Sequence, residues 1–146
     1  MIKIRRTAIV PFSAQQIYNL VNDVASYPQF LPWCANSKVL QQTDKEMLAS
    51  LEIQKGKFRQ TFTTRNKLQS PTSIIMQLSE GSFSRLHGEW HLTRLNANAC
   101  QVSFQLDFAF NNRLVAMTLT PLFRYIANTM IKAFSKRAAE IYGDEN

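Results

Sequence analysis

Two histidines and one glutamate alternate along a short stretch of the chain, at His87, Glu89 and His91. Side chains two residues apart point to the same face of a β-strand. Imidazole and carboxylate suit zinc or iron, so this stretch has the residue types for three ligands to a divalent metal. The apolar Leu86 and Trp90 mark the opposite face as buried, which gives the alternative that the three polar residues face water. We favour that alternative and predict no metal site.

Cys34 is a second candidate for chemistry, as a nucleophile. It follows Trp33 in an apolar segment, but a reactive cysteine needs a lowered pKa and a base beside it. The only histidines are the two named above, and nothing in the sequence places them near this thiol. We interpret Cys34 as a small buried apolar side chain. The sequence also has no P-loop, nucleophile elbow or apolar pair of carboxylates, so we expect a protein that is not an enzyme.

The basic residues are unevenly distributed. The chain has 17 Lys and Arg against 10 Asp and Glu, a formal net charge of +7, yet no acid occurs between Glu52 and Glu80. The cations in that interval share odd numbers, which predicts one face of a strand from 55 to 67. They are Lys55, Lys57, Arg59, Arg65 and Lys67. Two interpretations stay open: an ordinary solvated face, and a surface that contacts the phosphates of RNA. Because Phe58 and Phe62 fall on the opposite phase, base stacking on this face is not supported.

A folded core must position these residues, and the composition is that of a chain with such a core. With 146 residues, of which 45% are hydrophobic and 18% charged, the chain is globular and long enough for one domain over 1–146. Residues 2 to 12 alternate as a strand does. Ser13 and Gln16 then form the capping box of a helix. Prolines at 28 and 32 predict a broken helical turn or compact loop over 25–33.

The spacing of apolar residues changes once along the rest of the chain, from a strand period to a helix period. From Ser37 to Phe110 alternating runs and turn residues predict an antiparallel meander, which brings the total to about six or seven strands. After Asn112 the apolar period becomes 3.6, and Pro121 places the start of a long helix near Thr120. No stretch approaches 18 uninterrupted apolar residues, so we expect no membrane-spanning segment. The fold class is α+β, with a curved antiparallel sheet wrapped around the long C-terminal helix.

A sheet that grips a helix in this way often leaves an apolar cavity between them. On a helical projection, Arg137 falls in the middle of the apolar side of the predicted C-terminal helix. In one interpretation its aliphatic stem packs on the core and its guanidinium reaches water. In the other, the guanidinium lies at the mouth of the cavity and contacts a polar group of a ligand. The candidate cavity residues, which are equally core candidates, are Tyr27, Phe30, Leu31, Trp33, Phe62, Met76, Trp90, Phe104, Phe108, Ile126, Met130 and Arg137.

Several segments resemble a known family over essentially the whole chain. They are residues 6–14, 20–24, 26–34, 62–66, 106–110 and 130–138, and the most specific is Tyr-Pro-Gln-Phe-Leu-Pro-Trp at 27–33. The sequence resembles the START-like polyketide cyclase and lipid-transport superfamily, in the branch of coenzyme Q-binding proteins and bacterial ribosome-association toxins. The resemblance implies the helix-grip fold with a deep apolar cavity, and it brings no catalytic motif.

The resemblance implies two functions of different classes. In the first, the protein is a toxin of the toxin–antitoxin type that binds the large (50S) ribosomal subunit and blocks 70S association; its partner is then ribosomal RNA, not DNA. In the alternative, it is a chaperone for coenzyme Q (ubiquinone) or another lipid that supports respiration and makes transient membrane contact. We expect the first. A START-like cyclase or hydrolase has the least support, because no acid–base pair is visible.

The cysteines and the start of the chain bear on the compartment. Cys34 and Cys100 form no CxxC pair, and no signal peptide precedes the first strand. The resemblance implies a transit peptide in mitochondrial members, which this sequence does not show. We therefore expect a bacterial cytoplasmic protein without a cofactor, unless a bound ubiquinone or other lipid fills the cavity.

Overall fold

One curved sheet and one long helix make up most of the molecule. The computed structural model describes residues 1–143. The seven strands form one antiparallel sheet in the order β1-β7-β6-β5-β4-β3-β2. The elements are β1 (Ile2–Val10), α1 (Ala14–Asn22), η1 (Val24–Gln29), β2 (Cys34–Gln42), β3 (Glu46–Lys55), β4 (Phe58–Gln69), β5 (Ser73–Glu80), β6 (Phe83–Asn96), β7 (Ala99–Phe110) and α2 (Arg113–Tyr142). The α+β helix-grip expectation is confirmed, while the single-domain expectation over 1–146 stays a prediction.

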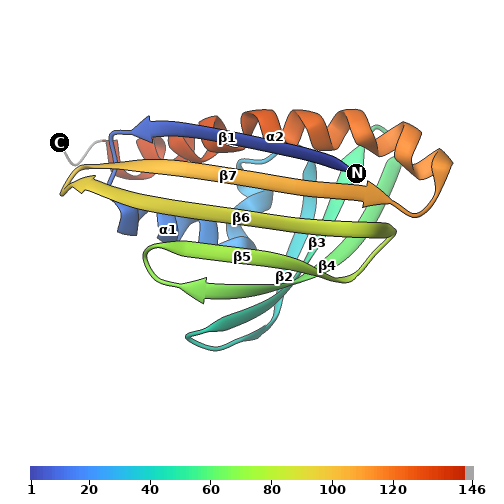
Figure 1. Cartoon of the computed structure of the whole chain (residues 1–146), viewed down its shortest axis with the longest axis horizontal. Coiled ribbons are helices and arrows are strands. Elements are labelled where there is room, and N and C mark those ends of the chain that lie inside the picture. The colour runs from blue at the N-terminus through green and yellow to red at the C-terminus, as the bar shows by residue number, and fades with distance from the viewer. Residues whose placement is uncertain (144–146) are drawn as a thin grey trace.

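The sheet bends around α2, which lies along one side of it (Figure 1). Even-numbered residues of β7 face the helix, and Phe104 and Phe108 are almost completely buried there. Phe134 of α2 packs edge-on against Trp90 of β6, with ring centroids 5.2 Å apart. This aromatic contact between sheet and helix forms the centre of the core and fixes which face of α2 points inward.

The first helix and the proline segment follow the sequence prediction. Ser13 Oγ accepts a hydrogen bond from the Gln16 amide at 3.1 Å, and the Ser13 amide donates to Gln16 Oε1 at 3.0 Å. Both halves of the capping box are therefore present. The predicted broken turn is η1, a short 3₁₀ helix that contains Pro28. The buried Tyr27 hydroxyl donates to the Val21 carbonyl and holds η1 against α1.

The start of the long helix was placed wrongly by the sequence. The helix begins at Arg113, about two turns before the expected Thr120, and it runs through Pro121. The Asn112 side chain accepts hydrogen bonds from the Leu114 and Val115 amides, so it caps this earlier start. Proline leaves one backbone carbonyl without its amide partner. Burial of the neighbouring apolar residues against the sheet offsets that loss.

The sequence predicted a single strand from Lys55 to Lys67, and the structure shows that this prediction is wrong. Lys55 ends β3, Gly56 and Lys57 form a turn, and β4 begins at Phe58. Gly56 has a φ of +59°, a conformation that glycine adopts without a steric penalty and that this tight turn uses. The chain therefore reverses in the middle of the cationic group, and β3 returns along β4 as its hydrogen-bonded neighbour.

Helix α2 is long and apolar enough to cross a membrane by length and composition alone. A core helix of a folded domain passes the same test, and one face of α2 is indeed core. Its buried residues are Leu119, Phe123, Ile126, Ala127, Met130, Ile131, Phe134 and Ala138. Only 28% of its most apolar 18-residue stretch is buried, however. Much of the apolar character of α2 therefore lies outside the core.

Candidate functional site

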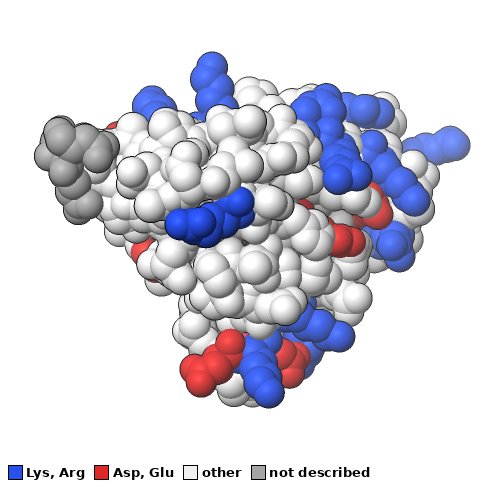
Figure 2. Space-filling model, turned by 60° about the vertical axis from the view of Figure 1, so that its left-hand side comes forward, with Lys and Arg blue, Asp and Glu red and all other residues white. Residues whose placement is uncertain are grey.

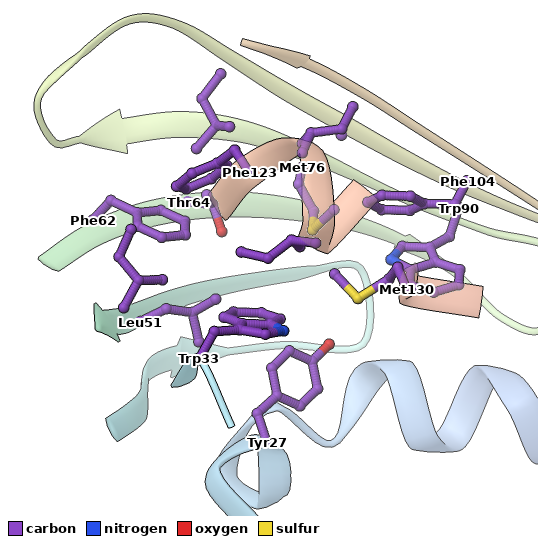
Figure 3. Close-up of a pocket in the computed structure, with 15 residues that line it drawn as sticks. Tyr27, Trp33, Leu51, Phe62, Thr64, Met76, Trp90, Phe104, Phe123 and Met130 are labelled. Carbon is purple, nitrogen blue, oxygen red and sulfur yellow. The ribbon is translucent and has the colours of Figure 1, made fainter. Parts of the chain in front are cut away.

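A small apolar cavity lies between the inner face of the sheet and α2 (Figure 3). Its volume is about 70 Å³. An engineered apolar cavity that admits benzene measures about 150 Å³, and ligand pockets begin near 300 Å³. A bulky ligand therefore requires side chains to move before it can enter. The lining residues are Tyr27, Trp33, Leu51, Ile53, Phe62, Thr64, Met76, Leu86, Gly88, Trp90, Phe104, Leu106, Phe123, Ile126 and Met130.

Eight of the expected cavity residues line this space: Tyr27, Trp33, Phe62, Met76, Trp90, Phe104, Ile126 and Met130. Phe30, Leu31 and Arg137 line a separate groove outside it. Phe108 is fully buried but does not line the cavity, because it packs beside Phe123 and Phe110 under the first half of α2. Among the lining residues that sequence reasoning missed, Leu51 and Leu86 share the inward phase of their strands, and that phase could have identified them.

Two methionines reach into the cavity from opposite walls. Met76 on β5 and Met130 on α2 extend their thioethers between the aromatic rings (Figure 3). Met76 pairs with Gly88 of β6, and a Cβ on Gly88 would lie 2.5 Å from the Met76 terminal methyl. The glycine therefore leaves the room that this methyl fills. Because methionine has three flexible torsions, rotation of these two side chains enlarges the cavity at low cost.

The cavity is suited to binding and has no group for acid–base catalysis. Its one titratable residue is Tyr27, whose pKa is raised by burial, next by Cys34 and then by Asp23, so the phenol stays neutral. The other lining hydroxyl, Thr64 Oγ1, donates to Asn66 Oδ1 at 2.8 Å. Both hydroxyls thus donate to protein oxygens. The remaining wall offers apolar and aromatic contact, which fits an apolar ligand.

Trp33 separates the cavity from an outer groove of about 510 Å³ between the η1–β2 segment and α2. Arg137 lies in this groove, where its Nη2 donates to Gln29 Oε1 at 2.9 Å. Its guanidinium carbon is 5.2 Å from the centroid of the Phe30 ring. The side chain is 22% exposed, so its stem is packed and its head is held by neighbours. Arg137 joins α2 to the proline segment outside the cavity wall.

Two of the five predicted RNA-binding cations have acidic partners that the acid-free sequence interval does not reveal. Arg59 forms an ion pair with Glu52 at 3.0 Å, and Arg65 forms one with Glu46 at 3.4 Å. Both acids come from β3, which runs beside β4. Within residues 1–143, Lys55, Lys57 and Lys67 make no ion pair. In one view of the surface, Lys and Arg form several separate groups, some with acids among them, around a broad uncharged area (Figure 2).

The two histidines of β6 are both hydrogen-bonded to the glutamate between them. His87, Glu89 and His91 lie on the outer face of β6, and each imidazole Nε2 is 2.8 Å from a Glu89 oxygen. These hydrogen bonds, first from His91 and then from His87, lower the pKa of Glu89. No group of three metal-ligating side chains is arranged to hold an ion in the part of the chain that the structure describes. The geometry here is a hydrogen-bonded surface network.

The cysteine candidate is buried and protonated. The Cys34 thiol donates to the Asn36 carbonyl at 3.4 Å. Burial raises the pKa of Cys34 to about 11, while the hydrogen bond to Asn36 opposes that rise only in part. A thiolate is the reactive form of cysteine, so this environment disfavours nucleophilic attack.

Comparisons with known proteins agree with this fold. The chain is 47% identical over 142 residues to "Ribosome association toxin RatA" of Escherichia coli (strain K12), covering 97% of this chain and 90% of that protein. It is 26% identical to the mitochondrial "Coenzyme Q-binding protein COQ10 homolog B" of Xenopus laevis, covering 97% of this chain and 60% of that one. The Zhui aromatase/cyclase from a Streptomyces species superposes with a TM-score of 0.83 at 17% identity, covering 94% and 93% of the two chains. At that identity the likeness shows a common fold only. A model of the polyketide cyclase / dehydrase and lipid transport family matches residues 10–135, and the chain belongs to this family.

Proposed function

We propose that this protein inhibits translation without catalysis, by binding the large (50S) ribosomal subunit in the cytoplasm and blocking 70S association. The observation that carries the proposal is the near-full-length identity of 47% to a protein named as a ribosome association toxin. The cavity is compatible with it, since its lining holds no acid–base pair that would point to an enzyme. The contact with ribosomal RNA is then electrostatic and made at the protein surface.

The turn between β3 and β4 is the best candidate for that contact. Lys55 and Lys57 flank its tip, are exposed, and have no ion-pair partner among residues 1–143. Arg59 and Arg65 follow on β4, each with one acid at hand. Lys67 lies ten residues after Lys57 along the turn and β4, or about 33 Å, a length that follows an RNA backbone past several phosphates. The turn therefore carries the cations without acidic partners, and β4 extends the row of cations away from it.

Subunit association on sucrose gradients tests the proposal. Separated ribosomal subunits are mixed with the protein, and we expect fewer 70S particles, with the protein sedimenting with 50S. The log of the association constant should fall with log salt by about 0.7–0.9 per phosphate contact. The double variant K55E/K57E should bind at least about tenfold more weakly, because each reversal replaces attraction by repulsion. The matched variant K38E/R94E reverses two exposed cations elsewhere and should behave like the parent.

Two results would count against this proposal. Unchanged 70S formation at low salt would contradict the proposed function itself. Normal inhibition by K55E/K57E, with loss in K38E/R94E, would leave the function and move its surface. Circular dichroism of each variant confirms that a loss is not caused by unfolding.

A second function, binding of a quinone or another lipid, is favoured by one specific observation. Two flexible methionines line the cavity, and Met76 fills the room that Gly88 leaves, so this wall can open for an apolar ring. The relative named as a coenzyme Q-binding protein supports the same chemistry. Mass spectrometry of an organic extract of the purified protein tests it. A stoichiometric quinone or lipid supports this function, and a ligand-free extract from cells rich in quinone counts against it.

A further inference from the structure

The outward side of helix α2 carries an unusual run of apolar side chains. Leu114 is 74% exposed, Met117 is 70% exposed and Tyr125 is 56% exposed. Together with the exposed Pro121 they recur at intervals of three and four residues, so they form one stripe. The stripe lies opposite the buried face of the helix, and α2 runs along the side of the molecule (Figure 1). Exposed large apolar residues in such a contiguous set mark an interaction surface.

The charged residues that α2 itself contributes beside this stripe are all cations. Arg113 and Arg124 flank it, and Lys132 continues it toward the C-terminal end of the helix. None of the three forms an ion pair with residues 1–143. No acid occurs from residue 108 to residue 139, a longer acid-free interval than the one on β4. We call this surface the outer α2 face: Arg113, Leu114, Met117, Pro121, Arg124, Tyr125 and Lys132.

We propose that the outer α2 face docks on an anionic lipid membrane, with α2 lying in the plane of the interface. Apolar side chains on a helix, flanked by Lys and Arg, are the features of helices that bind at the boundary of headgroups and acyl chains. Only 28% of the most apolar 18-residue stretch of α2 is buried, which agrees with an apolar stripe left uncovered by the rest of the molecule. The opposite face of α2 forms the core, so the helix lies on the membrane and does not cross it.

The chemistry favours a membrane over the two other occupants of such a face. Ribosomal RNA satisfies the cations but offers no apolar phase for Leu114 and Met117. A second copy of the chain would bring Arg113 and Arg124 against the same like charges if the two faces met about a two-fold axis. An anionic membrane supplies negative headgroups for the cations and acyl chains for the apolar stripe. The inference is independent of ribosome binding, which we assign to the β3–β4 turn.

Flotation with lipid vesicles tests the inference. The full-length protein is mixed with vesicles of phosphatidylcholine alone or with about one-third phosphatidylglycerol, a mixture that lowers the surface potential. We expect binding to the anionic vesicles only. The variant L114S/M117S should bind at least about fivefold more weakly, because it removes buried apolar area, and R113E/R124E at least about tenfold more weakly, because each anionic contact becomes repulsive.

Matched controls separate the face from general charge and hydrophobicity. I9S removes an exposed apolar residue on β1, where Ile9 is 69% exposed, and K38E/R94E reverses two cations outside α2. Both should bind vesicles like the parent. All altered residues are exposed, so the fold is expected to survive, and thermal melts check it.

Four outcomes would overturn the inference. They are equal binding to both vesicle types, parental binding by either α2 variant, loss of binding in both controls, and a protein dimer that L114S/M117S dissociates without any vesicle binding. Loss of 50S co-sedimentation in the α2 variants, with vesicle binding intact, would instead assign this face to RNA. Failure of the ribosome proposal alone leaves the vesicle result unaffected, so the two can be distinguished.

Discussion

The outer face of β4 and the outer face of α2 are both rich in cations, but their surroundings differ. On β4, Arg59 and Arg65 each meet a glutamate from the adjacent strand β3. On α2, Arg113 and Arg124 meet no acid within residues 1–143, and exposed apolar side chains lie between them instead. A strand inside a sheet has neighbours from elsewhere in the chain, whereas the outer side of a surface helix has none. The local sequence therefore gives the net charge of a helix face more reliably than that of a strand face.

This contrast also bears on function. Next to the paired arginines of β4, the β3–β4 turn carries Lys55 and Lys57 without ion-pair partners among residues 1–143, which suits contact with a phosphate backbone. The α2 surface combines free charge with apolar area, which suits a lipid interface. The two proposals therefore assign two cationic surfaces of one small protein to two different polyanions.

The largest expected effect tests whether α2 has one core face and one outer face. Phe134 is 1% exposed and packs against Trp90, so F134A should destabilise the protein by about 3–5 kcal/mol. L114A on the outer face should change the free energy of unfolding by less than about 0.5 kcal/mol. Urea unfolding followed by circular dichroism measures both. Equal losses in the two variants would show that the outer face is also packed.

The second prediction removes the difference between the two surfaces. E46Q/E52Q frees Arg59 and Arg65 from their acidic partners and leaves β4 cationic without compensation, as α2 is. If the β3–β4 surface contacts ribosomal RNA, 50S affinity should rise by about three- to tenfold at low salt, with a steeper salt dependence. Co-sedimentation across a salt series measures it. The variant E140Q, altered at an exposed acid of α2, is the control and should leave 50S affinity unchanged.

The third prediction measures how strongly the acids hold the β4 cations. The Arg59 and Glu52 side chains are 57% and 32% exposed, so solvent screens their attraction. A double-mutant cycle with R59A and E52A should give a coupling energy of about 0.2–1 kcal/mol in unfolding experiments. A coupling well above that range would mean that the pair is fixed, and that Arg59 is not free to contact a phosphate.

The smallest effect concerns a third outer surface, that of β6. Hydrogen bonds from His91 and His87 lower the pKa of Glu89 below its usual 4.5, so the carboxylate stabilises the fold above its unfolded pKa. That contribution is lost as pH falls through the folded pKa. E89Q should therefore be less stable than the parent by a few tenths of a kcal/mol near pH 7, with the gap closing below about pH 4. Melting temperatures between pH 3 and 7 test this, and a pH-independent gap would contradict it.

Sequence reasoning predicted local features well where neighbours in the chain decide them. The capping box at Ser13 and Gln16 and the broken turn around Pro28 depend on residues a few positions apart, and both are present. The start of α2 was misplaced because the prediction took Pro121 to mark the first turn, whereas the structure has Asn112 as the helix cap. Proline is tolerated in a helix interior when packing offsets the lost hydrogen bond, and packing is a tertiary property.

The candidate site was predicted less completely. The inward phase of each strand identified Phe62, Trp90 and Phe104 as cavity or core residues, but it could not separate lining from filling. Phe108 has the same phase as Phe104 and lies in solid packing. Only the relative placement of α2 over the sheet decides which inward side chain meets empty space.

The sequence by itself determined the alternation of strands, the amphipathic long helix and the excess of seventeen cations over ten acids. These follow from the identity and spacing of nearby residues. The tertiary structure alone decided that β3 brings Glu46 and Glu52 to the β4 cations, that Met76 fills the space left by Gly88, and that one side of α2 remains uncovered. Each depends on strand register or helix packing, which join residues that the linear sequence keeps apart.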